Sequence, residues 1–261
     1  MKKRILSILV MSLIFIPALL LGGIYFKIMN IIIAFMMVYE LIKARNKNYL
    51  DNKLSLILLS IFILLIMIPK EGLFNSNTIK IILTSLISFM LLTLYKEEFN
   101  TEDAMFYSAI IIFITLPLRY LVYLRSFRMG LVIYILLCAM LTDVFAYLGG
   151  SLVGKHKLYP KVSPKKTVEG SVIGIILSSI CMVPIHYYVV SNNNSLLISI
   201  LVTLAMVTIS EIGDLFFSKV KREYKIKDFS NLIPGHGGIL DRMDSILFTT
   251  VLYYIISGGL V

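Results

Sequence analysis

Residues 196–217 read LLISILVTLAMVTISEIGDLFF, a run of apolar residues long enough to cross a lipid bilayer as a helix. A transmembrane helix needs about 20 mostly apolar residues, because the hydrocarbon core of a bilayer is about 30 Å thick. Two acidic residues, Glu211 and Asp214, lie near the carboxyl end of this run. Similar apolar runs recur on both sides of it. Their repetition along the chain predicts a fold of several membrane-spanning helices.

The composition supports a membrane protein. Residues of apolar type make up 58% of the 261 residues, charged residues only 15%, and the mean hydropathy is +0.89. Soluble domains have about 25% charged residues, and a soluble globule of this size has too little interior to bury so much apolar surface. Two cysteines exclude a disulfide scaffold. We therefore predict an all-α, polytopic integral membrane protein.

The apolar runs predict about nine transmembrane helices. The first run follows a basic amino terminus, as a signal peptide would, but a second long run follows almost at once and favours an uncleaved span. The predicted spans are Ile5–Leu21, Gly23–Ile42, Leu54–Ile68, Ile79–Leu94, Met105–Tyr123, Met129–Leu148, Ser171–Val190, Leu196–Phe217 and Ser245–Val261.

The formal net charge of +10 indicates the orientation in the membrane. Short loops rich in Lys and Arg usually face the cytoplasm, which places residues 2–4, 43–53, 149–170 and 218–244 on that side. The segment 119–128 disagrees, because its three arginines would lie outside; either a span is miscounted or this segment is re-entrant or interfacial. Nucleic acid is not an expected partner, because the basic residues are scattered between spans.

The polar residues are unevenly distributed along what we interpret as a single membrane domain, 1–261. Residues 1–120 consist mainly of apolar spans, and we assign them to packing and lipid contact. Residues 121–261 contain the long polar loops. The catalytic helices and cytoplasmic loops are therefore predicted in the second half.

Three acidic residues near the ends of spans are candidates for function. Asp143 lies near the end of the sixth span, and Glu211 and Asp214 lie near the end of the eighth. A carboxylate in a span usually faces a polar cavity, a partner or an ion, because burying it in lipid costs several kcal/mol. The alternative is that these acids lie at the interface and bind water.

The stretch 233–245 reads IPGHGGILDRMDS, a glycine-rich turn that leads into the ninth helix. Backbone N–H groups at such a turn can bind an anion. Asp241 and Asp244 share one face of the helix, being three residues apart. With Asp214 they could hold Mg²⁺, which prefers oxygen ligands. The alternative is that both acids only stabilise the positive end of the helix dipole.

Lysines and arginines are dense in segments 155–166 and 218–227. These basic residues could serve only to orient the chain in the membrane and to attract anionic lipid. Alternatively, they could form a site that binds anions. Carboxylates are interleaved with these cations. Transport of an anion would need the lysines but not these carboxylates. Cations together with a carboxylate-held metal are what phosphoryl or nucleotidyl transfer requires.

Segment 218–244 resembles the signature of the phosphatidate cytidylyltransferase family, the CDP-diacylglycerol synthases. The resemblance rests on SKVKR at 218–222, KDFS at 227–230 and PGHGGILDRMD at 234–244. The loop 154–170, with GKHKL and SPKKTVEG, is similar to the same family. The specific motifs cover residues 120–261, and the amino-terminal part matches only as apolar spans.

This resemblance implies the reaction CTP + phosphatidate → CDP-diacylglycerol + pyrophosphate, by in-line transfer at the cytoplasmic face of the inner membrane. The implied cofactor is Mg²⁺, with a second ion such as K⁺ as an option. The implied partners are CTP, phosphatidate and membrane lipids, with a homodimer as a further option. The implied metal ligands are Asp214, Asp241 and Asp244, with Lys219, Arg222 and His236 as further catalytic residues. The residues implied to bind substrate are Asp143, Ser163, Lys165, Lys166, Thr167, Gly237 and Gly238.

Two kinds of alternative stay open at this stage. Another CTP-using membrane enzyme, such as a prenol kinase or a CDP-archaeol synthase, would share the basic and acidic residues. A kinase would release CDP instead of pyrophosphate. A polytopic transporter without catalysis would move or bind its substrate with no requirement for Mg²⁺.

Overall fold

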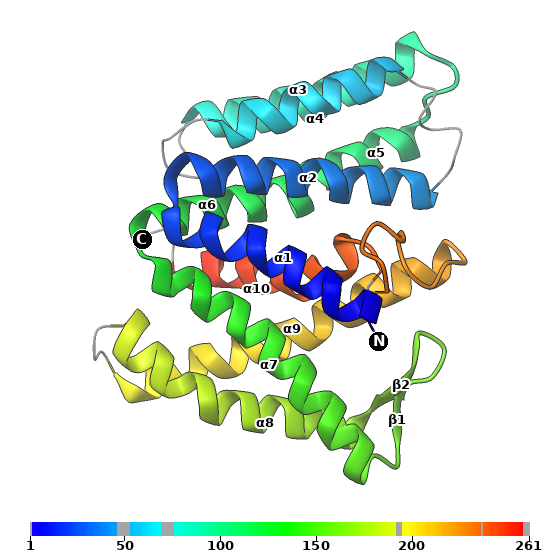
Figure 1. The fold of residues 1–261 in the computed structure, drawn as a ribbon. Helices are drawn as coiled ribbons and strands as arrows, with labels where there is room; N and C mark the ends of the chain where they lie inside the picture. Colours follow the sequence, from blue (N-terminus) through cyan, green and yellow to red (C-terminus); the bar gives the residue numbers. More distant parts are fainter. Residues whose placement is uncertain (1, 46–52, 69–75, 192–194, 236, 258–261) are drawn as a thin grey trace. The chain divides into compact units, whose positions relative to one another are not determined.

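A computed structural model describes residues 2–45, 53–68, 76–191, 195–235 and 237–257 of the chain (Figure 1). Within these residues the chain forms nine continuous helices, and they correspond one for one to the predicted spans. The prediction of an all-α protein is confirmed. His236 and the last residues of the ninth predicted span, 258–261, lie outside the described residues.

The chain divides into two compact units, which are described separately. Unit 1 comprises Met1–Ser126 together with Phe229–Leu240, and unit 2 comprises Phe127–Asp228 together with Asp241–Val261. The glycine-rich turn before the ninth helix is thus packed with the amino-terminal helices.

Unit 1 is built from antiparallel helices joined by short connections. Its core contains a chain of aromatic edge contacts: the ring centroid of Phe89 lies 6.0 Å from that of Phe62 and 5.4 Å from that of Tyr107. These packed rings hold three successive helices of the unit together. The helices are α1 (Lys2–Leu21), α2 (Gly23–Arg45), α3 (Lys53–Met67), α4 (Ser76–Tyr95), α5 (Thr101–Ile110) and α6 (Leu116–Phe127), with the π-helical segment η2 (Ile111–Thr115) between the last two.

Unit 2 contains the four remaining helices and one hairpin. The strands pair antiparallel, with Lys157 opposite Thr167. The hairpin was not predicted, because its segment is read from the sequence only as a basic loop. The elements are α7 (Met129–Val153), β1 (Lys157–Tyr159), β2 (Ser163–Thr167), α8 (Val168–Ile185), the π-helical η3 (His186–Val190), α9 (Leu196–Glu223) and α10 (Leu240–Ile256), whose first residue belongs to unit 1.

A proline lies close to each of the two π-helical segments. Pro117 lies two residues after the end of η2, and Pro184 lies two residues before the start of η3. Proline has no N–H to donate to the carbonyl four residues earlier, and its ring crowds that carbonyl. The carbonyl affected by Pro117 is that of Phe113, within η2, where the helix widens for one turn instead of breaking.

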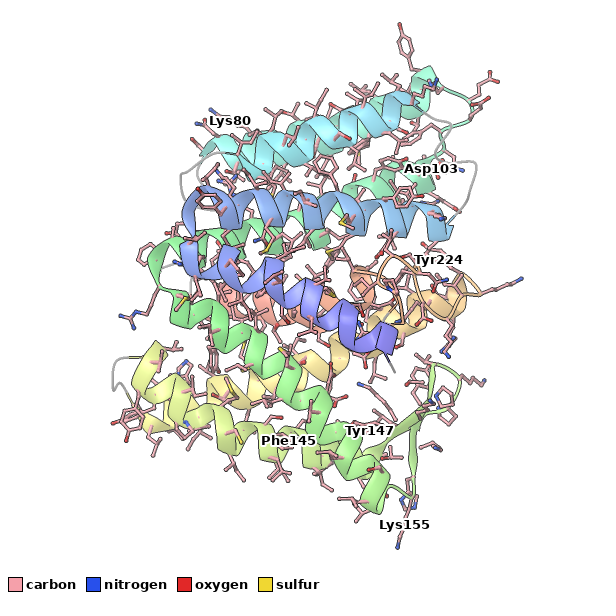
Figure 2. All side chains as sticks on the ribbon, in the orientation of Figure 1. Lys80, Asp103, Phe145, Tyr147, Lys155 and Tyr224 are labelled. Atoms are coloured by element: carbon pink, nitrogen blue, oxygen red, sulfur yellow. The ribbon has the colours of Figure 1, made fainter. Side chains whose placement is uncertain are left out.

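The helices have the length and surface of membrane spans. Six of them are long and apolar enough to cross a bilayer: 23–45, 76–95, 101–127, 129–153, 168–190 and 196–223. Side chains project outward along the helices (Figure 2), and large apolar ones such as Leu13, Leu94 and Leu152 are 76%, 83% and 82% exposed. Such surfaces suit contact with lipid, and the protein is a multi-pass membrane protein.

The arginines of segment 119–128 have structural partners. Arg119 is buried and donates to the carbonyl of Ile66 near the end of α3. The guanidinium of Arg125 donates from Nε to the carbonyl of Leu19 at 2.5 Å. The final turn of a helix has carbonyls without intrahelical partners, which cationic side chains can satisfy. These arginines therefore satisfy carbonyls at helix ends; the side of the membrane on which they lie stays a prediction.

Candidate active site

Unit 2 contains a cavity of about 280 Å³ at the junction of α7, β2, α8 and α9. It brings together five of the residues that the sequence implicates in binding or catalysis. Those five are Asp143, Lys165, Lys166, Thr167 and Asp214, and the other lining residues are Ala146, Tyr147, Gly150, Ser151 and Ser171.

Lys166 is the central cation of this cavity. Its Nζ lies 2.6 Å from Glu211 Oε2 and 2.7 Å from Asp214 Oδ2, and its side chain is 17% exposed. Burial alone would lower the pKa of Lys166, but the two carboxylates outweigh it and raise the pKa above its usual value. The ammonium group is thus held charged and in one position by two residues of α9.

The local fold fixes the position of Lys166. The next residue, Thr167, caps α8, because its Oγ1 accepts a hydrogen bond from the N–H of Gly170 at 3.1 Å. Gly170 also lets α8 approach α7 closely, since a Cβ there would lie 2.8 Å from the Cα of Gly150. The strand that bears Lys166 therefore joins α8 at a defined angle beside α7.

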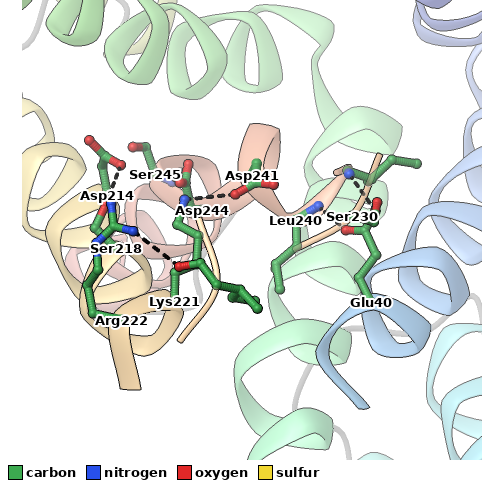
Figure 3. A network of polar contacts seen from close by, with 12 residues as sticks. Glu40, Asp214, Ser218, Lys221, Arg222, Ser230, Leu240, Asp241, Asp244 and Ser245 are labelled. Carbon is green, nitrogen blue, oxygen red and sulfur yellow. Dashed lines mark hydrogen bonds and ion pairs between the residues drawn. The ribbon is translucent and has the colours of Figure 1, made fainter. Parts of the chain in front are cut away.

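A second ion pair lies at the start of α10. Lys221 Nζ is 2.7 Å from Asp241 Oδ1, and the two side chains are 11% and 4% exposed (Figure 3). Asp244, one turn further along α10, is buried and accepts the N–H of Ser245 at 2.8 Å. The structure thus provides Asp241 with a cationic partner, Lys221, that was not among the predicted site residues.

The carboxylates of unit 2 repel one another. Asp214 interacts electrostatically with both Asp143 and Asp244. Glu211 Oε1 is buried and has no hydrogen-bond partner among the described residues. A cation brought into this region would relieve both unfavourable features. Within the described residues, no three acidic, histidine or cysteine side chains lie close enough together to hold a metal ion by themselves.

The other predicted residues of unit 2 lie near the carboxyl end of α9 and at the start of β2. Lys219 is 58% exposed and lies 3.8 Å from Glu223 on the same helix. Arg222 donates from Nε to the carbonyl of Val162 at 3.1 Å, which ties the hairpin to the end of α9. Ser163 begins β2 and is half-buried. The roles assigned to these residues stay predictions.

The glycine-rich turn is a tight bend within unit 1. Ile233 donates its N–H to the carbonyl of Gly237 at 2.9 Å. Gly235 and Gly237 have φ angles of +82° and +87°, a backbone conformation that favours glycine.

Glu40 of α2 holds this turn and was missed by the sequence analysis. Its carboxylate accepts hydrogen bonds from the N–H of Ile239 at 2.9 Å, the N–H of Leu240 at 2.8 Å and the hydroxyl of Ser230 at 2.5 Å (Figure 3). The side chain is 0% exposed. Gly238 lies so close that a Cβ there would be 2.6 Å from Glu40 Oε1. Glu40 therefore fixes the backbone that leads directly into Asp241.

A Lys166→Met variant tests the charge balance of the cavity. Removing the ammonium leaves the carboxylates of Glu211 and Asp214 close together without their cation, and loss of one partner of a buried pair costs about 3–5 kcal/mol. We expect a clear fall in the unfolding midpoint in denaturant titrations of the detergent-purified protein. The neighbouring Lys165→Met removes the same charge from an exposed side chain and should change the midpoint little. Equal stability of both variants would contradict the role of Lys166.

Comparison with known proteins shows which family and which relatives the chain resembles. The model of the cytidylyltransferase family matches residues 2–258. A phosphatidate cytidylyltransferase of Staphylococcus saprophyticus is 35% identical over 98% of both chains. Proteins with the same name from Staphylococcus haemolyticus and Staphylococcus aureus are 37% and 34% identical, again over 98% of both chains.

The helical membrane fold together with the family match places this protein among the membrane-embedded nucleotidyltransferases. More particularly, the chain belongs to the cytidylyltransferase family. The match extends through the amino-terminal helices, which the sequence motifs alone did not cover.

Proposed function

We propose that this enzyme transfers the cytidylyl group of CTP to phosphatidate, forming CDP-diacylglycerol and pyrophosphate. The observation that carries the proposal is the unit 2 cavity, where Lys165 and Lys166 meet the carboxylates of Asp143 and Asp214. The relatives named phosphatidate cytidylyltransferase, aligned over 98% of the chain, support this choice of substrates.

In the proposed reaction an oxygen of the phosphatidate phosphate attacks the α-phosphorus of CTP. The new O–P bond forms as the bond to the β-phosphate oxygen breaks, and the electron pair leaves with pyrophosphate. The attacking phosphate is already anionic, so catalysis depends mainly on positioning and charge stabilisation. Lys165, exposed at the cavity, would neutralise phosphate charge, while Lys166 would keep the Asp214 carboxylate oriented.

Mg²⁺ fits the donor set of this region as a proposed cofactor. Mg²⁺ in phosphate-transferring sites is usually held by one or two carboxylates together with water and substrate phosphates. Asp214 and Asp244 would supply those carboxylates, and Asp241 could join them if Lys221 moved to a phosphate. Bound Mg²⁺ would neutralise charge on the phosphate oxygens. The repulsion among the carboxylates and the unpartnered Glu211 Oε1 support a cation here.

The proposed location of this chemistry is the cytoplasmic face of the cell membrane. CTP is a cytoplasmic solute, and the loops between α7 and α8 and after α9 are rich in lysine. Loops of this kind are retained on the cytoplasmic side. The membrane helices would deliver the lipid substrate to a cavity that also opens to water.

Pyrophosphate release by the purified protein in detergent tests the proposal. We expect release only when CTP, phosphatidate and Mg²⁺ are all present, its loss on adding EDTA, and its recovery with excess Mg²⁺. Formation of CDP in place of pyrophosphate would identify a lipid kinase. Absence of any nucleotide turnover, in protein that remains folded, would overturn the proposed reaction.

A further inference from the structure

The hairpin of β1 and β2 has an exposed basic surface that the proposed reaction does not use. The segment 154–167 connects α7 to the helix 168–190, and both helices are long and apolar enough to cross a bilayer. A connection of this kind lies at a membrane interface, because backbone outside helices is not tolerated within the lipid. We define the hairpin surface as four exposed residues: Lys155, Lys157, Tyr159 and Lys161.

The hairpin is held at both ends, so it does not project freely into solvent. At its base, the carboxylate of Glu169 in α8 accepts the N–H of Lys155 at 3.0 Å and the N–H of His156 at 3.1 Å. At the other end, Val162 is buried, and its carbonyl accepts a hydrogen bond from Arg222 near the carboxyl end of α9. The hairpin therefore lies between the end of α7 and the end of α9, along one face of unit 2 (Figure 1).

The two strands of the hairpin have different surroundings. Among the described residues, 165–167 of β2 line the unit 2 cavity, and no residue of β1 does. In β1, the exposed Lys157 and Tyr159 alternate with the half-buried Leu158, as expected for a strand with one side turned to the outside. The hairpin surface is therefore separate from the cavity, although the two share one sheet.

The hairpin surface has positive charge that nearby acids do not neutralise. Residues 144–168 include no acidic residue. The next acid, Glu169, is engaged by two backbone N–H groups and by the imidazole of His156. Among the described residues, none of the three ammonium groups of the surface forms an ion pair or a hydrogen bond. Lys155 is directed away from the ribbon (Figure 2), so the group can meet an anion from outside the chain.

Apolar side chains next to the lysines indicate the chemistry of the partner. Leu152 and Val153, in the last turn of α7, are 82% and 49% exposed and precede the hairpin directly. Tyr159 is a residue type that is enriched at membrane interfaces, because its ring is apolar and its hydroxyl is polar. A soluble anion such as inorganic phosphate would match the lysines alone. A phospholipid with an anionic headgroup would match the lysines and the apolar side chains together.

We propose that the hairpin surface binds anionic phospholipid headgroups of the bilayer that surrounds the protein. Phosphate oxygens would contact the three lysines, and the acyl chains would lie against the end of α7. Lysines close to a membrane surface strengthen its attraction for anionic lipid severalfold each. The hairpin would thus gather anionic lipid beside the unit 2 cavity, whatever reaction the cavity performs.

Tryptophan fluorescence can measure which lipid lies next to the hairpin. The chain contains no tryptophan, so Tyr159→Trp introduces a single reporter. The full chain is placed in equimolar bilayers of phosphatidylcholine and phosphatidylglycerol, with quenching bromine atoms on the acyl chains of one lipid or the other. We expect quenching that corresponds to an enrichment of phosphatidylglycerol of about fivefold or more. Equal quenching by the two brominated lipids would overturn the proposal.

A second reporter separates the hairpin from the general attraction of a basic protein for anionic lipid. Ile180→Trp, at an exposed position of α8, reports the lipid around unit 2 as a whole and should show little preference. The same preference at both reporters would assign the effect to the net charge of +10 and refute a site on the hairpin. Saturating CTP should leave the preference at residue 159 in place, and its loss would assign the lysines to the nucleotide.

Charge variants of the Tyr159→Trp protein identify the lysines responsible. Lys157→Gln together with Lys161→Gln should abolish most of the enrichment, and arginine at both positions should retain it. Lys53→Gln together with Lys80→Gln is the matched control, because it removes the same charge from exposed positions outside the hairpin. Raised salt should also weaken the enrichment without any substitution at the lysines. An enrichment that survives the loss of both hairpin lysines would contradict the proposal.

Discussion

An Asp214→Asn variant is expected to lose about 10³-fold in kcat for pyrophosphate release. Asp214 lines the unit 2 cavity, pairs with Lys166 at 2.7 Å and accepts a longer bond from Ser218 at 3.4 Å. Asparagine has nearly the same shape but no charge, so it holds a divalent cation much more weakly and cannot balance the ammonium. Because Lys166 retains Glu211 at 2.6 Å, the fold should survive.

The matched control is Glu223→Gln, which removes the same charge from an exposed position on the same helix. It should retain activity within about twofold, as surface substitutions away from a site usually do. The unfolding midpoints of both variants show whether any loss reflects catalysis. An Asp214→Asn protein that is folded and retains near-normal kcat would remove Asp214 from the catalytic centre.

The helices could be predicted because a bilayer imposes length and hydropathy on every span. Nine apolar runs became nine continuous helices within the described residues. The hairpin 157–167 escaped prediction, because two short strands rich in lysine lack the alternating pattern of a half-buried strand. Side-chain contacts flank the hairpin at its base: Thr167 accepts the N–H of Gly170 in α8, and Glu169 accepts the N–H of Lys155 just before β1.

The candidate site could be predicted only as a set of residue types. Motifs in the sequence indicate Lys166 and Asp214 separately, but nothing in their spacing shows that they form an ion pair across 48 positions of chain. Such contacts form only when α8 and α9 pack together in the tertiary structure, which local sequence patterns do not reveal. The partner of Asp241, Lys221, was hidden for the same reason among several lysines of one basic segment.

Glu40 was missed although a physical signal for it exists. A carboxylate within an apolar span is costly and needs polar partners, and Glu40 lies within the second predicted span just as Asp143 and Asp214 lie within the sixth and eighth. The helix Gly23–Arg45 contains one glutamate, and it is fully buried. The assignment of residues 1–120 to packing alone therefore overlooks a side chain that supports the glycine-rich turn.

Replacing Glu40 with alanine is expected to destabilise the protein by about 2 kcal/mol or more, because the N–H groups of Ile239 and Leu240 lose their acceptor. We also expect kcat to fall about 100-fold, since these residues lead directly into Asp241 and small displacements of catalytic groups are costly. Denaturant titration and pyrophosphate release measure the two effects. Glu97→Gln, at an exposed position of unit 1, is the charge-matched control and should change neither.

A double-mutant cycle with Gly238 identifies the contact responsible. A Gly238→Ala change alone should be destabilising, because its Cβ would lie 2.6 Å from Glu40 Oε1. In the Glu40→Ala background the obstructing carboxylate is absent, so the same change should have little further effect. Residues in contact show non-additive energies, whereas independent ones add. Strict additivity of the two changes would mean that Glu40 stabilises the protein without holding the turn.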